Sequence, residues 1–358
     1  MKWNKKHIFL TLFLPFQMVL MRLAERNPEF IEHYYSNGTY PIISGFFRIT
    51  LGWIPFSVGD FLLAFGLFVF FRFTYRLIKG KFKNLAPKVL HLTSILSIIY
   101  FCFYLFWGLN YYRLPLAKNL NYEHEKYSNK QLQNVTEHII KKLNEYHFKI
   151  TKNDSLIVVT PYSHKEIYKM AISGYNNLSE IYPQLNYQYP SVKSSLMSEV
   201  QSYNGTSGYL NPFTGEAHIN DKIPKTSSPT TTCHEIAHQI GYAAENEANF
   251  VGFLAANYNQ NLYFKYASYR MAFGYCFSEI KKRDNDLSKK LLTTLHSGII
   301  KDFRNSTIFW KSYKNPFEPI IKKGYNAYLK ANKQDKGVAS YNYVVDLLIS
   351  YFETSETF

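Results

Sequence analysis

The sequence is poor in cysteine, in charged residues and in the residues typical of low-complexity chains. Its three cysteines in 358 residues (Cys102, Cys233 and Cys276) cannot form a disulfide scaffold, and they lack the paired spacing of a zinc ribbon. Gly (17) and Pro (14) are too few for a collagenous or low-complexity chain. Charged residues make up only 19% of the chain and aromatic residues 18%, which excludes intrinsic disorder. The length allows two or three domains.

Acidic residues are also scarce. The 26 Asp and Glu stand against 41 Lys and Arg, which gives a formal net charge of +15. Such a balance is typical of proteins that bind nucleic acid or an anionic membrane. The excess is densest where the chain is most apolar, because residues 1–110 carry 12 Lys and Arg against 4 Asp and Glu. We therefore expect membrane lipid as a partner, and no nucleic acid.

Three apolar stretches lie in the first third of the chain, at about residues 8–23, 56–78 and 90–109. A helix needs about 20 mostly apolar residues to cross the hydrocarbon core of a bilayer. The first stretch is also short enough for a signal peptide, but no A-x-A-like cleavage site follows it. The alternative is that all three are core helices of a soluble protein. The pattern predicts a three-helix transmembrane region over residues 1–110.

The distribution of Lys and Arg around these stretches predicts their orientation. Lys2, Lys5 and Lys6 precede the first stretch, and six basic residues lie between Arg72 and Lys88, around the loop that joins the second and third. Basic segments in short loops remain on the cytoplasmic side. We expect a multi-pass protein of the bacterial inner (cytoplasmic) membrane, with its N-terminus in the cytoplasm and residues 111–358 outside.

Residues 111–358 have the pattern of an α+β domain that is mainly helical with a small sheet. Two capping boxes, Ser128–Gln131 and Ser163–Glu166, each precede apolar residues at helical spacing. The apolar run 156–159 predicts a strand between these helices. Residues 193–220 are rich in turn residues and predict short strands joined by hairpins. From Pro229 onward the pattern is helical.

One motif in this domain carries chemistry, His234-Glu235-Ile236-Ala237-His238. On a helix, residues four apart share a face, so both imidazoles can reach one metal ion. Zinc suits two His nitrogens and a carboxylate, with a fourth position left for water. Glu235 is the candidate catalytic residue, because a carboxylate beside the first His can take a proton from that water. The alternative is a pair of solvated histidines on a surface helix.

The third metal ligand requires a break after the second histidine. In an unbroken helix Glu245 would lie about 10 Å along the axis from His238, too far to share an ion. Gly241 is a residue at which the helix can end. On a second helix that starts near Glu245, this carboxylate is our first choice of ligand and Glu247 is the alternative. Asn249, one turn later, is placed to hydrogen-bond a ligand histidine.

The remaining candidates have weaker patterns. The hairpin over residues 208–220 is either an edge strand that pairs with an extended substrate or an ordinary packed hairpin. Cys233 is either a fourth ligand or, as we favour, a small buried residue. The candidates for contacting substrate or stabilising an oxyanion are Tyr269, Asn211 and Thr214, with Tyr242 and His218 as further choices for the oxyanion.

The segment His234–Phe250 (HEIAHQIGYAAENEANF) resembles the gluzincin pattern, in which a second-helix Glu followed four residues later by Asp or Asn completes a zinc site. The chain as a whole resembles an uncharacterised family of bacterial inner-membrane proteins that carry a domain of unknown function. That resemblance includes the hairpin over 208–217, the stretch 266–269 and the tail over 328–341. It implies a membrane-anchored zinc metallopeptidase. In better-known gluzincins the Glu comes much later than seven residues after the second His.

The sequence therefore predicts a zinc-dependent hydrolase of peptide bonds, with a peptide or protein substrate. One alternative is a membrane-anchored binding or assembly module whose Zn²⁺ is structural and held by four protein ligands. Another is an intramembrane protease, which is disfavoured because residues 230–258 contain three Glu among polar residues.

Overall fold

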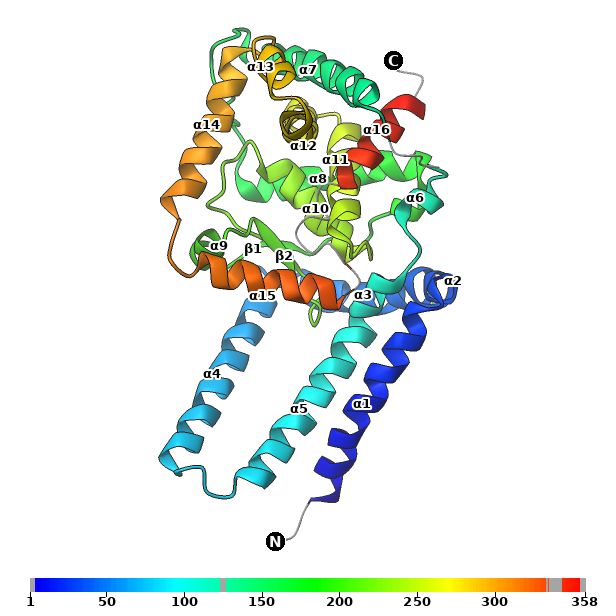
Figure 1. Cartoon of the computed structure of the whole chain (residues 1–358), viewed down its shortest axis with the longest axis vertical. Coiled ribbons are helices and arrows are strands. Elements are labelled where there is room, and N and C mark those ends of the chain that lie inside the picture. Colours follow the sequence, from blue (N-terminus) through cyan, green and yellow to red (C-terminus); the bar gives the residue numbers. More distant parts are fainter. Residues whose placement is uncertain (1–3, 123–126, 333, 335–342, 355–358) are drawn as a thin grey trace. The chain divides into compact units, whose positions relative to one another are not determined.

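The computed structural model describes residues 4–122, 127–332, 334 and 343–354 (Figure 1). By the contacts among its residues the chain divides into two compact units. Unit 1 comprises Met1–Leu114 and the segment Asn211–Glu216, and unit 2 comprises Pro115–Leu210 and Ala217–Phe358. The sequence places a boundary near residue 110, and it gives no reason to assign residues 211–216 to the first unit.

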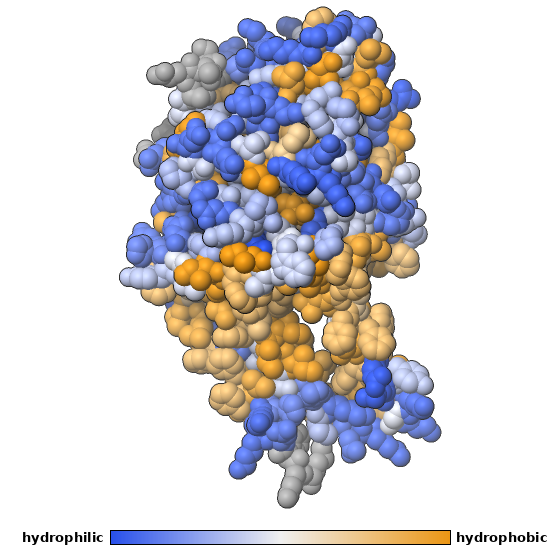
Figure 2. All heavy atoms as spheres, turned by 180° about the vertical axis from the view of Figure 1, so that it is seen from behind, coloured by the Kyte–Doolittle hydropathy of each residue, from blue (hydrophilic) through white to orange (hydrophobic). Residues whose placement is uncertain are grey.

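Three helices of unit 1 are long and apolar enough to cross a membrane: α1 (Lys5–Glu25), α4 (Val58–Lys79) and α5 (Leu85–Phe106). Their bounds lie within five residues of those expected from the sequence. Apolar side chains gather over these helices (Figure 2), and most of them are not buried by other parts of the chain. This surface is suited to lipid rather than to water, and it marks the N-terminal region as membrane-associated.

Helices α1 and α5 pack against each other through polar contacts as well as apolar ones. Gln17 Nε2 donates to Ser97 Oγ at 2.9 Å, and His7 Nδ1 lies 2.9 Å from Ser94 Oγ. Polar side chains on apolar helices need such partners because the hydrocarbon offers none. These contacts indicate that the two helices associate as a pair.

The segment between α1 and α4 is helical. It contains α2 (Pro28–Phe30), the π-helix η1 (Ile31–Thr39) and α3 (Tyr40–Gly52). A short 3-10 helix, η2 (Gly108–Tyr112), follows α5. Glu32 of η1 forms a buried, bidentate ion pair with Arg113, with N···O distances of 2.7 and 2.9 Å. The negative charge of Glu32 is thus paired inside the unit.

The segment Asn211–Glu216 is hydrogen-bonded to the N-terminus of α4. The Glu216 carboxylate is fully buried and accepts hydrogen bonds from the backbone N–H of Val58 (3.2 Å) and Gly59 (2.6 Å). It also accepts from Thr214 Oγ1 at 3.0 Å. A helix N-terminus favours a negative charge and has free N–H groups, so this carboxylate is stabilised there.

Unit 2 is mainly helical, as expected. Its helices are α6 (Leu116–Asn119), α7 (Asn129–Thr151), α8 (His164–Ile181), η3 (Pro183–Leu185), α9 (Ser198–Asn204), α10 (Ser228–Gln239), α11 (Glu245–Tyr258), α12 (Leu262–Arg283), α13 (Asn285–Leu292), α14 (Ser297–Ser312), α15 (Glu318–Ala331) and α16 (Val344–Thr354). The two predicted capping boxes are confirmed at the starts of α7 and α8.

A three-stranded sheet in order β1-β3-β2 accompanies these helices in the described part of unit 2. β1 (Val192–Ser194) runs parallel to β3 (Ala217–Ile219), and β2 (Gly208–Leu210) runs antiparallel to β3. The expectation of short strands with a hairpin is confirmed, although helix α9 interrupts the region. Strand β2 is an edge of this sheet. The observed class is α+β.

The strand predicted over residues 156–159 is wrong. This run is irregular, and its backbone groups are bonded by side chains instead of by a neighbouring strand. Val158 N donates to Asp302 Oδ2 at 3.3 Å, and Leu156 O accepts from His147 Nε2 at 2.8 Å. The apolar pattern was correct about burial only at Val158, which is 5% exposed, since its neighbours Ile157 and Val159 are exposed.

Helix α11 runs through the core of unit 2 and packs against α8, α10, α12 and α16. Its Phe250 and Phe253 are fully buried. The packing against α8 is very close, because a Cβ on Gly174 would lie 2.2 Å from the carbonyl oxygen of Ala255. Only glycine fits at that position, and this contact fixes α11, which begins with Glu245, against its neighbours.

Candidate metal centre

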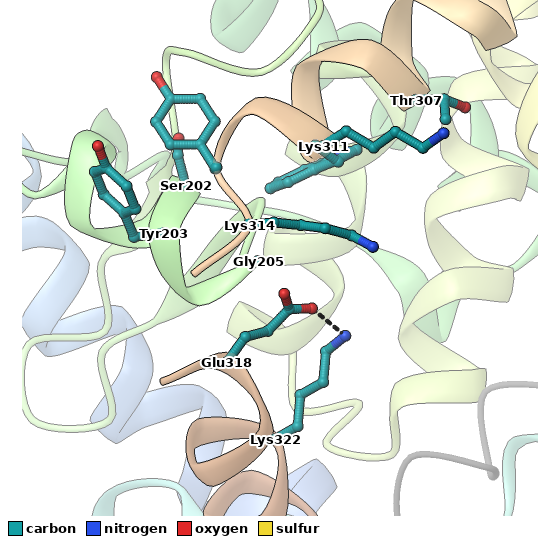
Figure 3. A pocket seen from close by; sticks show the side chains of 10 residues that line it. Ser202, Tyr203, Gly205, Thr307, Lys311, Lys314, Glu318 and Lys322 are labelled. Carbon is teal, nitrogen blue, oxygen red and sulfur yellow. Dashed lines mark hydrogen bonds and ion pairs between the residues drawn. The ribbon is translucent and has the colours of Figure 1, made fainter. Parts of the chain in front are cut away.

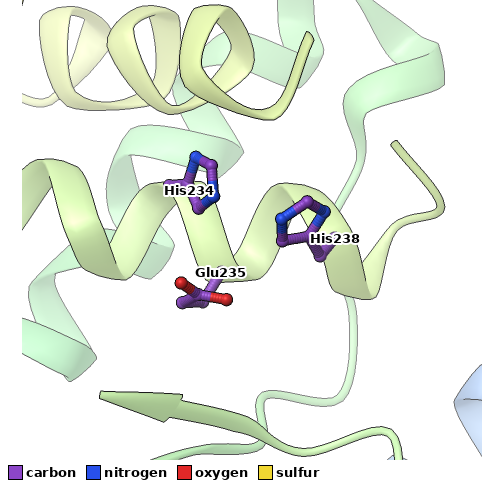
Figure 4. A group of neighbouring side chains, drawn as sticks. All are labelled: His234, Glu235 and His238. Carbon is purple, nitrogen blue, oxygen red and sulfur yellow. The ribbon is translucent and has the colours of Figure 1, made fainter. Parts of the chain in front are cut away.

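Helix α10 presents the two histidines of the motif on one side. Pro229 lies in the first turn, where its missing N–H costs no helical hydrogen bond. The ring centroids of His234 and His238 are 4.7 Å apart (Figure 4). The nitrogen and oxygen atoms that His234, Glu235 and His238 offer to a metal all lie within 4.8 Å of one another. The motif therefore forms a compact cluster and not a pair of solvated side chains.

The predicted break after His238 is confirmed. Helix α10 ends at Gln239, and Gly241 has φ +94°, a backbone conformation that favours glycine. Gly241 N donates to His238 O, and Tyr242 N donates to Ala237 O. The chain reverses direction within this turn, and α11 then begins at Glu245.

The turn brings the Glu245 carboxylate to both imidazoles. Glu245 Oε2 lies 3.3 Å from His234 Nε2 and 3.8 Å from His238 Nε2, and the side chain is 9% exposed. Two ligands bound at about 2.0 to 2.2 Å to a tetrahedral zinc ion are about 3.3 to 3.6 Å apart. The distance from Glu245 Oε2 to His234 Nε2 falls in this range, and the distance to His238 Nε2 exceeds it by a few tenths of an ångström.

The alternative ligand, Glu247, has another partner. Its Oε1 accepts a hydrogen bond from Leu116 N at 2.7 Å, at the start of α6. Two residues along a helix turn a side chain by about 200°, so Glu245 and Glu247 face different surroundings. The geometry favours Glu245 as the third ligand.

The hydrogen bonding of His238 determines which ring nitrogen faces Glu245. Nδ1 lies 2.7 Å from the Tyr242 carbonyl oxygen, which only accepts, so Nδ1 carries the proton. In the neutral ring Nε2 then has a lone pair, and it faces the negative Glu245 carboxylate at 3.8 Å. A lone pair and a carboxylate repel each other unless a cation or a proton lies between them. Metal-bound histidines commonly donate their other N–H to a carbonyl in this way.

The electrostatics of the cluster follow from burial and from the pairing of Glu245 with the imidazoles. Burial alone lowers the pKa of His238, but the Glu245 carboxylate outweighs it and raises that pKa to about 9. Burial raises the pKa of Glu245, but hydrogen bonds from His234 and His238 hold it well below its ordinary value. The raised pKa of His238 and the lowered pKa of Glu245 both indicate that the Glu245 carboxylate is negative and that it favours a positive charge beside it.

Glu235 has a different environment. It is 3% exposed, and within the described part of the chain its Oε2 has no hydrogen-bond partner. Burial raises its pKa, while His234 and His238 act in the opposite direction. Strand β2 passes directly beside it, because a Cβ on Gly208 would lie 2.6 Å from Glu235 Oε1. Such a carboxylate is available to exchange protons with a small molecule in the cluster.

Tyr325 is a residue of the site that the sequence motifs did not indicate. It lies on α15, eighty residues after Glu245, and its hydroxyl donates to Glu245 Oε1 at 2.7 Å. This bond leaves Oε2 for the imidazoles and orients the carboxylate. No local pattern around Tyr325 distinguishes it from the other 30 tyrosines, so only the fold identifies it.

Asn249 lies one turn after Glu245 on α11 and is buried. The expected hydrogen bond to a ligand histidine does not form among the described residues, because Asn249 Nδ2 and His234 Nδ1 are both buried without a partner. Cys233 is fully buried, burial raises the pKa of its thiol, and its carbonyl accepts from Tyr175. It packs in the core, as expected for a small apolar residue.

The three candidates for substrate or oxyanion contact, Tyr269, Asn211 and Thr214, make packing contacts or hydrogen bonds within their own units. The ring of Tyr269 packs among Tyr146, Phe253 and Phe352. Asn211 and Thr214 belong to the segment fastened to α4. Asn211 Oδ1 accepts from Phe213 N, and Thr214 donates to Glu216. These contacts order the fold, and the ring contacts of Tyr269 are with other aromatic side chains of unit 2.

The close approach of α10 and α11 depends on Gly252. We therefore predict that alanine is more destabilising at Gly252 than at Gly208. A Cβ at Gly252 would lie 3.0 and 3.1 Å from the backbone N and Cα of His234, which cannot swing aside. We expect Gly252→Ala to lower the free energy of unfolding by about 1 to 3 kcal/mol, as overpacking does. The three atoms nearest to a Cβ at Gly208 belong to the Glu235 side chain, which can shift whereas backbone cannot, so the cost of Gly208→Ala is expected to be smaller.

The measurement is denaturant unfolding of the full chain in detergent. Gly324→Ala is the control, because a Cβ there has nothing within 4 Å and alanine is favoured in a helix by about 0.5 to 1 kcal/mol. Equal stabilities of the Gly252→Ala and Gly324→Ala variants would contradict the packing described here.

Comparison with known proteins gives one match. No curated protein matches the chain, and no solved structure matches it. The family model described as "Protein of unknown function (DUF3810)" matches residues 35–349, which is most of the chain and includes the whole of the cluster described above. The chain therefore belongs to the DUF3810 family of proteins of unknown function.

Proposed function

We propose that the protein is a membrane-anchored zinc metallopeptidase. The observation that supports this most is the meeting of His234, His238 and Glu245, in which the carboxylate lies 3.3 and 3.8 Å from the two imidazoles, close to the separation of two zinc ligands. The orientation of His238, fixed by the Tyr242 carbonyl, supports it further, because the lone pair on Nε2 is directed at the place where a cation is needed.

A zinc ion held by these three side chains would polarise a substrate carbonyl and lower the pKa of a water molecule beside it. Glu235 takes the proton from that water through its buried, unbonded oxygen. It then delivers the proton to the leaving amine, since the same carboxyl can act as base and acid in turn. Tyr325 holds Glu245 in place through the hydrogen bond to Oε1.

Strand β2 is suited to bind an extended peptide. It lies at an edge of the sheet, and Gly208 brings its backbone against Glu235 without an intervening side chain. An edge strand offers unpaired N–H and C=O groups to a second chain. A peptide added to this edge would run beside the carboxylate that we assign as general base.

A structural zinc site is the alternative, and one observation favours it. Glu235 lies within 4.8 Å of both histidines in the same cluster, so it is a possible fourth ligand that would close the site. The intramembrane alternative has less support, because neither α10 nor α11 is among the candidate spans of the described residues.

The ligand assignment predicts different effects for the two glutamates of α11. We expect Glu245→Gln to weaken zinc binding by about 100-fold or more, since loss of a supporting partner alone costs about 10- to 100-fold. Glu247→Gln is the matched control, because its amide oxygen can still accept from Leu116 N. Zinc affinity is measured by competition with a chromophoric chelator on the full chain in detergent. Equal zinc loss in both variants would refute the assignment.

Glu235→Gln separates the peptidase from the structural site. As general base, Glu235 contributes about 10²- to 10⁴-fold to the rate, so we expect kcat/KM to fall by that factor while one zinc per chain is retained. Rates are measured with a library of fluorogenic peptides and zinc by metal analysis. If the variant loses its zinc, Glu235 is a ligand; if it cleaves as fast as the unaltered chain, the mechanism is wrong.

We propose further that the chain lies in the bacterial inner membrane with its N-terminus in the cytoplasm. The loop between α4 and α5 contains Lys81 and Lys83, and Arg72, Arg76 and Lys88 flank it. Basic loops remain in the cytoplasm, so the residues after α5 would lie outside.

Reporter fusions test this orientation. Alkaline phosphatase, which is active only outside the cytoplasm, is expected to be active when fused after Phe358 and inactive when fused after Lys83. A fluorescent protein that matures only in the cytoplasm should give the opposite result. Activity of the phosphatase at Lys83 would reverse the assignment.

A further inference from the structure

A pocket lies in unit 2, lined by residues of α9, α14 and α15 and of the turn between α14 and α15 (Figure 3). It encloses about 520 Å³, within the range of about 300 to 1,000 Å³ that is usual for small-molecule sites. None of the residues that hold the metal cluster lines it. The proposed peptidase activity therefore leaves this pocket without a role.

The charges in the pocket are mainly positive. Three lysines line it, and one of them, Lys322, is paired with Glu318 on the same helix. Lys311 and Lys314 have no side-chain hydrogen bond or ion pair among the described residues. Their ammonium groups point to the same side of the pocket in Figure 3. The hydrogen bond from Lys322 and the charge of Lys314 lower the pKa of Glu318, so Lys314 also lies near that carboxylate. Three ammonium groups against one carboxylate nevertheless leave the pocket with net positive charge that favours an anion.

The walls of the pocket are aromatic and are held in place. Trp310, Tyr203 and Tyr313 line it, and the rings of Tyr203 and Tyr313 meet edge to face at 5.1 Å. Asn315 Nδ2 donates to Tyr203 O at 2.7 Å, which ties the turn before α15 to α9. Aromatic faces beside cations are suited to a ligand that has a ring or a sugar as well as a negative charge.

We propose that this pocket binds a phosphate ester, with the phosphate at Lys311 and Lys314 and the ring, sugar or glycerol portion against Trp310. Lysine binds phosphate as a point charge, and two lysines can share one phosphate dianion. The volume admits one such unit and not a polymer. The shared chemistry occurs in the headgroup of an anionic phospholipid and in a free sugar phosphate, and the inference does not depend on the proposed peptidase activity.

Trp310 gives a direct readout, because the other three tryptophans (Trp3, Trp53 and Trp107) all lie in the first 107 residues. The full chain in a non-ionic detergent is titrated with glucose 6-phosphate, with glucose as the uncharged control and short-chain phosphatidylglycerol as the lipid probe. We expect a saturable change in tryptophan fluorescence with glucose 6-phosphate and none with glucose. Trp310→Phe should abolish the signal, which assigns it to this pocket.

The double variant Lys311→Gln/Lys314→Gln is expected to weaken binding by about tenfold or more, because it removes both ammonium groups that attract the phosphate. The matched control is Lys281→Gln/Lys290→Gln, which removes the same charge from exposed positions on α12 and α13. Circular dichroism checks that both variants fold.

The titration with short-chain phosphatidylglycerol distinguishes a lipid headgroup from a soluble phosphate ester as the ligand. Tighter binding of short-chain phosphatidylglycerol than of glucose 6-phosphate supports the site as a headgroup site, and the reverse supports it as a site for a soluble ester. No saturable signal with either probe, or equal weakening in the two double variants, would overturn the proposal.

Discussion

The reversal of the chain between α10 and α11 is the constraint on which the candidate metal site depends. The histidines lie on one helix, and the third ligand that we favour, Glu245, begins the next. Because Gly241 takes φ +94°, the two helices fold against each other and Glu245 Oε2 comes within 3.3 and 3.8 Å of the two Nε2 atoms. A continuous helix would leave Glu245 about 10 Å along the axis from His238. One glycine in a left-handed conformation thus decides whether three side chains form one site.

The distances at the site are set by small residues that do not belong to it. Gly252 allows α11 to approach the backbone of His234, and Gly174 allows α8 to lie on the carbonyl of Ala255 at the far end of α11. Well-packed interiors transmit small displacements instead of absorbing them. A shift of α11 by a few tenths of an ångström would therefore appear as a change in the spacing of Glu245 and the histidines, even though neither glycine contacts a metal.

Those parts of the structure that depend on local pattern could be predicted from the sequence. The three apolar helices, the capping boxes of α7 and α8, the break near Gly241 and the start of α11 each rest on residues within about one turn of one another. The features that the sequence did not predict depend instead on contacts between residues far apart in the chain. The run 156–159 has the pattern of a strand, but Asp302 and His147 supply its backbone hydrogen bonds from distant segments. Likewise, Tyr325 reaches Glu245 from eighty residues away, and the helices between α1 and α4 bury a charge against Arg113.

The charge of the buried cluster also bears on the nature of its occupant. Glu235 and Glu245 are both almost fully buried, and a buried carboxylate is costly unless it is compensated. Neutral imidazoles and the Tyr325 hydroxyl provide dipoles but no net charge. Protons on both histidines would balance the two carboxylates, and the pKa of about 9 that the Glu245 carboxylate gives to His238 favours this charge. The proposed zinc ion would also balance both carboxylates, and it would bind the lone pair that the Tyr242 carbonyl directs inward. The buried carboxylates therefore require positive charge beside them, which either protonated imidazoles or the proposed zinc ion would supply.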